Sequence, residues 1–283
     1  MTKLELGPVG IGLDYVGHPL SAVLDAASEL EGLGFSSILL SGGANDDLSR
    51  VGEIVRRTDR IPVFPGIFSV DLIDRASVAR TYAEVQASDP DRFLVGLGGA
   101  HGPRPLETLA GYLDELDTLD PTVPASARIL AALGPRMLEL SRDRAAAALP
   151  ILVTPDYTAQ ARELLGPDTA LIVQHFVAVD TDPERARAAA RGPLSFLRQI
   201  PGYARNFARM GFSADDVAHL SDRMVDALVA WGDIEAIGEH VDALLRAGAD
   251  QVALTIVRVE GELEDLPAEQ WRRLAQIVPA TAG

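Results

Sequence analysis

The chain has 283 residues, of which 47% are hydrophobic, 5% aromatic and 23% charged. This composition is typical of a folded protein with a large aliphatic core, and it excludes a disordered or collagen-like chain. The net charge is −16, from 41 acidic and 25 basic residues, and Lys3 is the single lysine of the sequence. Because this charge repels phosphate backbones and anionic lipid, we expect no binding to nucleic acid or to membranes.

The sequence contains no cysteine, which removes disulfides, thiol nucleophiles and thiolate metal sites. Its first residues show no apolar run of signal-peptide length, and no segment has the roughly 18 apolar residues that a transmembrane helix needs. We therefore expect a cytoplasmic protein. The length alone fits two average domains or one large barrel.

Apolar, β-branched runs alternate with amphipathic stretches along the whole chain. Eight runs predict strands, over residues 8–15, 35–43, 61–70, 92–100, 127–133, 148–155, 170–179 and 251–257. Helices are predicted over residues 18–34, 47–57, 73–87, 106–119, 135–147 and 158–166, and a last one through Trp271. Residues 182–247 read as several helices with no strand among them.

Strands that are apolar almost throughout are what a parallel sheet covered on both faces requires. Eight strand-then-helix units in this length predict an α/β fold, a (β/α)8 TIM barrel with a helical insertion at about 182–247, between the seventh and eighth strands. We expect one domain over residues 1–283. A doubly wound sheet is the alternative, but it would need about six strands and a break in composition that the sequence does not show.

A glycine-rich loop, GLGGAHG at 96–102, follows the fourth predicted strand. Its spacing fails the dinucleotide fingerprint because the third glycine would fall at His101. Glycines at a barrel mouth allow close backbone approach to a flat or phosphate-bearing ligand. A tight turn between strand and helix explains the same residues equally well.

The five histidines do not form a metal motif, so we expect no metal site. His101 is a candidate donor to a cofactor ring, or an acid or base near neutral pH, and the alternative is a merely exposed side chain. His175 lies in an apolar strand and is predicted to be a core histidine bonded to a carbonyl. His18, His219 and His240 are expected at surface or capping positions.

The sixth predicted strand ends in Thr154, Pro155, Asp156 and Tyr157, which also open a helix. Their hydroxyl and N–H groups stand where an anion would bind. On these residues alone we favour the other interpretation, in which Thr154 or Asp156 caps the helix.

Three long segments, 129–168 (beginning ILAALGPRMLEL), 182–233 and 240–257, resemble in order and spacing the luciferase-like monooxygenase superfamily, in particular its actinobacterial branch of coenzyme F420-dependent oxidoreductases. Segment 93–117 resembles the same branch in part. The resemblance implies a barrel with a helical insertion before the last strand, in agreement with the strand count. It further implies a flavin or deazaflavin at the C-terminal mouth that carries hydride, and a homodimer.

The resemblance also implies roles for individual residues. Asp14, where the first strand reaches the pocket floor, and His101 would be catalytic. Gly66 and Ile67, followed by Phe68, would form a bulge with a non-proline cis peptide that backs the cofactor ring. The other implied cofactor-binding residues are Gly98, Gly99, Thr154, Pro155, Asp156 and Tyr157.

The sequence departs from the family at several places. The loop at 101–106 is short, the segment 41–49 replaces one that usually contains tryptophan, and Gln174 and His175 stand where a Glu-Gln pair is usual. Arginines near strand ends are the candidates to hold a cofactor phosphate, each with an exposed-surface alternative: Arg104, Arg128, Arg136 and Arg205.

We therefore expect an oxidoreductase that transfers hydride between coenzyme F420 and a small organic substrate. Two alternatives stay open: an FMN-dependent monooxygenase, and a non-catalytic barrel that has lost its cofactor. A trans bond between Gly66 and Ile67 would favour the last of these.

Overall fold

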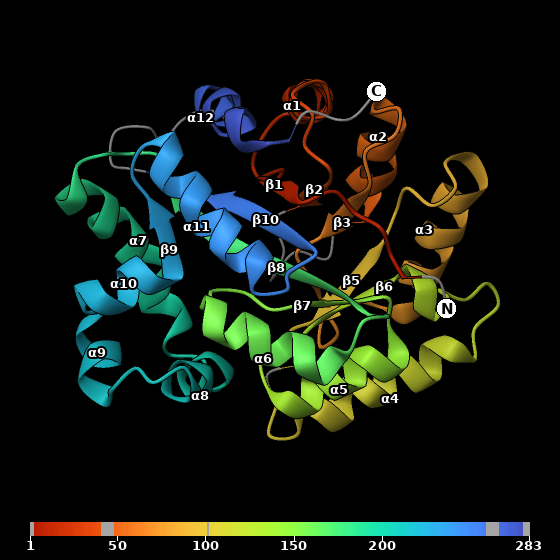
Figure 1. Cartoon of the computed structure of the whole chain (residues 1–283). Helices are drawn as coiled ribbons and strands as arrows, with labels where there is room; N and C mark the ends of the chain where they lie inside the picture. The colour runs from red at the N-terminus through yellow and green to blue at the C-terminus, as the bar shows by residue number, and fades with distance from the viewer. Residues whose placement is uncertain (1–2, 41–47, 101, 259–265, 280–283) are drawn as a thin grey trace.

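The structure is a computed structural model that describes residues 3–40, 48–100, 102–258 and 266–279. Its parallel strands curl into a nearly closed barrel surrounded by helices (Figure 1), which confirms the predicted α/β barrel. Neighbouring strands follow the order β3-β2-β1-β10-β8-β7-β6-β5-β4, and β9 pairs with β8. The strands are β1 (Val9–Leu13), β2 (Ile38–Leu40), β3 (Val63–Pro65), β4 (Phe68–Ser69), β5 (Val95–Gly98), β6 (Arg128–Ala131), β7 (Ala147–Leu149), β8 (Ala170–Ala178), β9 (Val229–Trp231) and β10 (Gln251–Ile256).

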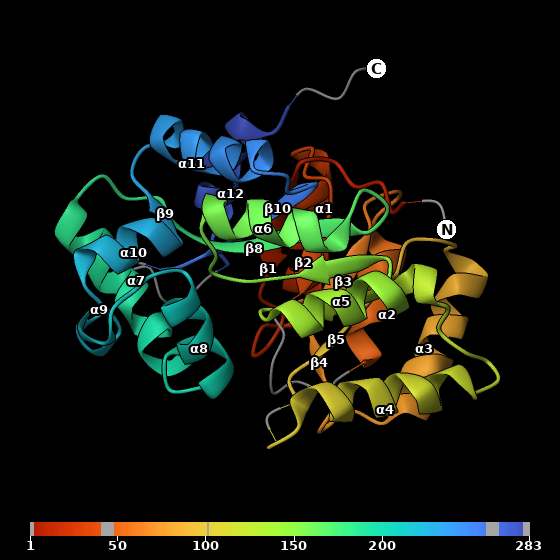
Figure 2. The same ribbon diagram turned by 60° about the horizontal axis from the view of Figure 1, so that its bottom comes forward.

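Helices follow the strands and cover the outside of the barrel, as Figures 1 and 2 show from two directions. They are α1 (Leu20–Gly32), α2 (Ser49–Arg57), α3 (Arg75–Ser88), α4 (Pro105–Asp117), α5 (Pro135–Arg144), α6 (Pro155–Leu165), α7 (Pro183–Leu197), α8 (Pro201–Arg209), α9 (Ala214–His219), α10 (Asp222–Leu228), α11 (Ile234–Arg246) and α12 (Ala268–Leu274). Short 3-10 turns lie at Ala125–Ala127 and Ala275–Ile277.

The third predicted strand is divided into β3 and β4 by a bulge. Val63 bridges Phe93, and Phe68 pairs with Leu97, so five steps along one strand lie opposite four along β5. One extra residue is thereby inserted, as in a β-bulge. The bulge that the resemblance implied at Gly66 is therefore present.

The peptide bond at this bulge is not the expected one. Gly66–Ile67 is trans, and the cis bond among the described residues is Asp120–Pro121. Gly96 on β5 lets the bulge approach, because a Cβ there would stand 2.3 Å from the carbonyl oxygen of Pro65. The extra residue is thus accommodated by a missing side chain on the neighbouring strand.

The sixth predicted strand is also shorter than expected. β7 ends at Leu149, and the next residue, Pro150, has no N–H for the sheet, although its carbonyl accepts from the N–H of Gln174 at 2.9 Å. α6 then begins at Pro155, inside the predicted strand.

The two faces of each strand are packed differently. Inward-facing residues fill the barrel with an apolar cluster that includes Leu39, Phe64, Leu94, Ile129 and Ile172. The alternate residues pack outward in a larger cluster beneath the helices. Since both faces are buried, the strands read as continuous apolar runs.

The insertion between β8 and β10 contains a strand, so the prediction of helices alone was wrong. β9 runs parallel to β8 from the pair Val229–Phe176 to the pair Trp231–Ala178. The Trp231 indole donates to Asp226 at 2.8 Å, and Arg187 binds the same carboxylate through two nitrogens at 2.9 and 2.7 Å. These contacts tie α7, α10 and β9 into one layer beside the barrel (Figure 1).

Candidate active site

The inner face of the barrel becomes more accessible to solvent toward the C-terminal ends of the strands. Gly12, Ala131, Gln174 and Thr255 are half-buried there, whereas almost every other residue of their strands is buried. Three of these four side chains are small or absent. These four inward-facing positions stay partly accessible at the end where active sites of such barrels lie, and we refer to them together as the recess.

Gln174 and Thr255 form a polar pair in this recess. The Gln174 amide nitrogen donates to the Thr255 hydroxyl at 3.1 Å. A Cβ at Gly12 would stand 3.3 Å from the same hydroxyl, so β1 borders the pair. No partner of the Gln174 amide oxygen exists within the described part of the chain, which leaves it able to accept a hydrogen bond from a ligand.

The glycines that end β5 are in contact with the bulge and with β6. A Cβ at Gly98 would lie 2.6 Å from the Ala131 Cβ and 3.3 Å from Ile67. Gly99 has φ +68°, and Ser69 donates to its carbonyl at 3.1 Å. Packing against the neighbouring strands thus explains why both positions are glycine. Their predicted contact with a cofactor stays a prediction.

Asp14 follows β1 at the barrel mouth and is exposed. Its carboxylate accepts from the N–H of Val16 at 3.1 Å. Arg50 holds the adjoining turn, since it donates to the carbonyls of Tyr15 and His18 at 2.8 and 2.9 Å. His101, the other predicted catalytic residue, and the segment 41–47 lie outside the described residues.

The turn from β7 to α6 is organised by helix capping. The Thr154 hydroxyl accepts from the Tyr157 N–H at 3.3 Å, Pro155 occupies the first turn, and Asp156 is exposed beside it. The Tyr157 hydroxyl donates to the carbonyl of Leu133 at 2.8 Å. Thr154 therefore acts as the cap that we favoured from the sequence, and the predicted contact of these four residues with a cofactor stays untested.

The four arginine candidates are separated by the fold. Arg128 is buried at the start of β6, at the end of the barrel away from the mouth, where it pairs with Asp117. Arg104 pairs with Glu107 at 3.0 Å. Arg136, in the first turn of α5, and Arg205, on α8, are exposed.

His175 points away from the recess and into the helix layer. It is fully buried, and its ring lies 4.6 Å from that of His240 on α11. Both ring nitrogens of His175 and Nε2 of His240 lack a hydrogen-bond partner. Within the described residues the expected carbonyl partner of His175 is thus absent, and His240 is half-buried rather than superficial. Burial holds the pKa of both imidazoles below the usual range, with His240 a further cause at His175.

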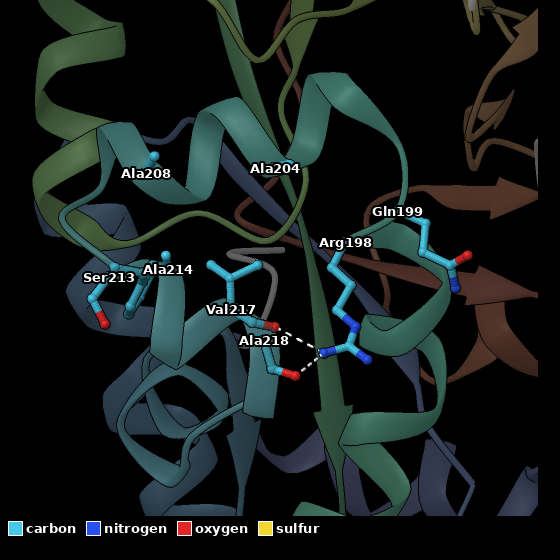
Figure 3. A pocket seen from close by; sticks show the side chains of 9 residues that line it. Arg198, Gln199, Ala204, Ala208, Ser213, Ala214, Val217 and Ala218 are labelled. Carbon is cyan, nitrogen blue, oxygen red and sulfur yellow. Dashed lines mark hydrogen bonds between the residues drawn. The ribbon is translucent and has the colours of Figure 1, made fainter.

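An open pocket of about 470 Å³ lies on the insertion and is lined by α8, α9 and the residues that follow α7 (Figure 3). Its walls are mostly apolar and include Ala204, Ala208 and Val217. Arg198 crosses beside it and donates to the carbonyls of Val217 and Ala218. Because this pocket has few polar groups able to orient a reactant, we place the candidate reaction at the barrel mouth.

The described residues offer neither a metal-binding cluster nor a membrane-spanning helix. No group of three or more histidine, aspartate or glutamate side chains is arranged to hold a metal ion. No helix in this part of the chain is long and apolar enough to cross a membrane.

Comparison with protein-family models and with curated proteins gave no match. Solved structures do match over nearly the full length. An F420-dependent secondary alcohol dehydrogenase, solved with an F420-acetone adduct, superposes with a TM-score of 0.73 at 12% identity, covering 99% of both chains. The coenzyme F420-dependent tetrahydromethanopterin reductase from Methanopyrus kandleri gives 0.68 at 15% identity, covering 97% of this chain and 99% of that one.

A third match uses a different cofactor. The oxygenating constituent of the 3,6-diketocamphane monooxygenase of Pseudomonas putida, solved with FMN, gives a TM-score of 0.64 at 16% identity, covering 95% of this chain and 96% of that one. The chain thus shares the fold of F420-dependent oxidoreductases and of FMN-dependent monooxygenases.

Proposed function

We propose that this protein is an oxidoreductase of the luciferase-like superfamily, of the branch that uses coenzyme F420, and that it acts on a small organic substrate at the barrel mouth. The observation that carries the proposal is the recess of Gly12, Ala131, Gln174 and Thr255, because these inward-facing positions are only half-buried and present the Gln174 amide oxygen to a ligand. Two solved structures with this fold contain an F420-acetone adduct and FMN, respectively. FMN is the alternative cofactor.

The residues present fit such a ring. The Gln174 amide oxygen would accept from an N–H group of the ligand, and Thr255 fixes the amide that presents it. The backbone of Gly98 and Gly99, with the bulge of Gly66, Ile67 and Phe68, would line one side. When bound, the coenzyme supplies the hydride chemistry.

The protein's own contribution to the reaction is binding and proton transfer. Asp14 is the exposed carboxylate next to the recess and is proposed to orient the substrate or exchange a proton with it. His101 is proposed for the same role from its position in the sequence. The apolar cluster beneath the recess keeps water from the inner face of a bound ring.

Titration of the purified protein with coenzyme F420 and with FMN, followed by fluorescence, tests the proposal. We expect saturable binding, and about five- to tenfold weaker binding in Gln174→Leu, since one neutral hydrogen bond is lost. Gln160→Leu, an exposed glutamine on α6, is the matched control and should bind like the wild type. If neither cofactor binds at high micromolar concentrations, the proposal is wrong.

One observation favours a second candidate, a barrel that keeps the fold but binds no ring. Ile67 reaches to 3.2 Å from where a Cβ of Gly99 would stand and 3.3 Å from that of Gly98, so it occupies space beside both glycines. The trans Gly66–Ile67 bond agrees with this candidate. Titration of Ile67→Ala separates the two: cofactor binding that appears only in this variant identifies a recess closed by Ile67.

A further inference from the structure

Three arginines beside the barrel mouth have no acidic partner. More than half of the arginines in this strongly acidic chain lie against a carboxylate. Within the described residues, no carboxylate lies at ion-pairing distance from Arg136, Arg205 or Arg209. All three are exposed. Exposed arginines that are grouped together and have no carboxylate partner favour a ligand of opposite charge.

The contacts of Arg209 show where the three arginines lie in the fold. Its guanidinium donates to the carbonyl of Leu133 at 3.4 Å and to the Asn206 side chain at 2.9 Å. A second nitrogen lies 4.0 Å from where a Cβ of Gly134 would stand. Arg209 is therefore seated on the turn from β6 to α5, at the C-terminal end of the barrel.

The other two arginines adjoin this turn from two elements. Arg205 precedes Arg209 by one helical turn, so both lie on one face of α8. Arg136 follows Gly134 by two residues, in the first turn of α5. Figures 1 and 2 both show α8 beside this end of α5.

The start of α5 adds to the positive potential. Gly134 caps the helix without a side-chain hydrogen bond, and the first turn contains no acidic residue. The partial positive charge of a helix N-terminus is therefore uncompensated there. At α6, by contrast, Thr154 already caps the helix and Asp156 places a negative charge in the first turn.

We propose that Arg136, Arg205 and Arg209 bind the phosphate group of a ligand whose ring lies in the barrel mouth. This inference rests on the proposed function, and it moves the phosphate from the predicted turn at Thr154 to the neighbouring turn between β6 and α5. Guanidinium groups suit a phosphate because their planar donors match its oxygens in pairs. Such a ligand is a phosphate ester, as FMN is.

The test compares FMN with riboflavin, which lacks the phosphate, in the wild type and in Arg136→Gln, Arg205→Gln and Arg209→Gln. We expect the wild type to bind FMN at least tenfold more tightly than riboflavin. Each variant should lose about five- to tenfold in FMN affinity and none in riboflavin affinity, since a charge-assisted hydrogen bond is removed. Arg142→Gln, at the other end of α5 and paired with Asp143, is the control and should leave both affinities unchanged.

The outcomes separate this site from the proposed function. If both flavins bind and their affinity ratio is the same in the variants as in the wild type, the arginine site is wrong and the ring site stands. If neither flavin binds, the effect of pyrophosphate on the melting temperature tests the arginine site instead. If coenzyme F420 does not bind either, the proposed function fails as well. A pyrophosphate-induced rise in melting temperature that the variants lose supports the anion site; a rise that they share with the wild type, or no rise, overturns it. Arg136 and Arg205 are exposed and make no hydrogen bond or ion pair to a described residue, so Arg136→Gln and Arg205→Gln stay informative if Arg209→Gln loosens α8.

Discussion

At the scale of single residues, the side of a strand that a side chain faces decides its role. Gln174 faces the recess and His175 faces α11, although both stand in the same apolar run. The sequence singled out this pair but could not assign the faces, because a strand buried on both sides lacks the polar alternation that distinguishes them. The polar pair of Gln174 and Thr255, from two strands far apart in the chain, was missed for the same reason.

The buried His175 and the half-buried His240 predict a loss of stability in mild acid. Their pKa values are lowered in the folded state, so the unfolded chain takes up more protons below about pH 6.5. The stability that comes from keeping both imidazoles neutral is therefore present above that pH and is lost as the pH falls. Urea unfolding between about pH 7 and pH 5 should show a falling free energy, by up to about 1.4 kcal/mol per pH unit for each histidine.

His240→Leu provides the check on this assignment. Leucine fills the site without a titrating group, so the slope of unfolding free energy against pH should become shallower, while stability near pH 7 is kept or improved. An unchanged slope in His240→Leu would show that other groups cause the acid sensitivity.

At the scale of elements, the bulge between β3 and β4 depends on glycine in the neighbouring strand. Alanine at position 96 would place its Cβ 2.3 Å from the backbone oxygen of Pro65, which cannot rotate away as a side chain can. We expect Gly96→Ala to lower the free energy of unfolding by about 1 to 3 kcal/mol, as overpacked cores do. Chemical denaturation measures this loss.

A helical glycine in open space gives the matched control. A Cβ at Gly111 on α4 would meet nothing within 4 Å, and alanine is the better helix former, so Gly111→Ala should stabilise by about 0.5 to 1 kcal/mol. Equal effects of the two substitutions would mean that the bulge can relax around an added methyl group.

At the scale of the whole molecule, the barrel and the bulge at Gly66 were predicted, and the strand within the insertion was not. The repeated apolar runs and amphipathic stretches were sufficient to predict eight strand-then-helix units, in the correct order. β9 was missed because Val229–Trp231 is three residues long and continues the apolar spacing of α10. The Arg209 contact with Leu133 was equally hidden, since it joins positions 76 apart.

The net charge of −16 predicts a salt dependence of stability. Repulsion among like charges disfavours the compact state, and added salt screens it. Raising NaCl from about 20 to about 200 mM should therefore raise the melting temperature by a few degrees in differential scanning fluorimetry. A melting temperature that falls with salt would instead show that the many Arg–carboxylate pairs outweigh the repulsion.

The position of β9 has a consequence for how the barrel opens. β7 pairs with the first residues of β8, and β9 pairs with its last ones, where β10 already occupies the opposite edge. On that side of β8 the barrel wall therefore consists of two strands, β7 and β9, which are more than seventy residues apart in sequence. The one nearer the mouth, β9, belongs to the insertion. If the insertion detached, this side of the barrel mouth would be exposed to solvent. Ligand binding in the recess should therefore be coupled to this opening. A bound ligand is expected to slow hydrogen exchange of the backbone amides of Val229–Trp231, even if it does not contact that strand.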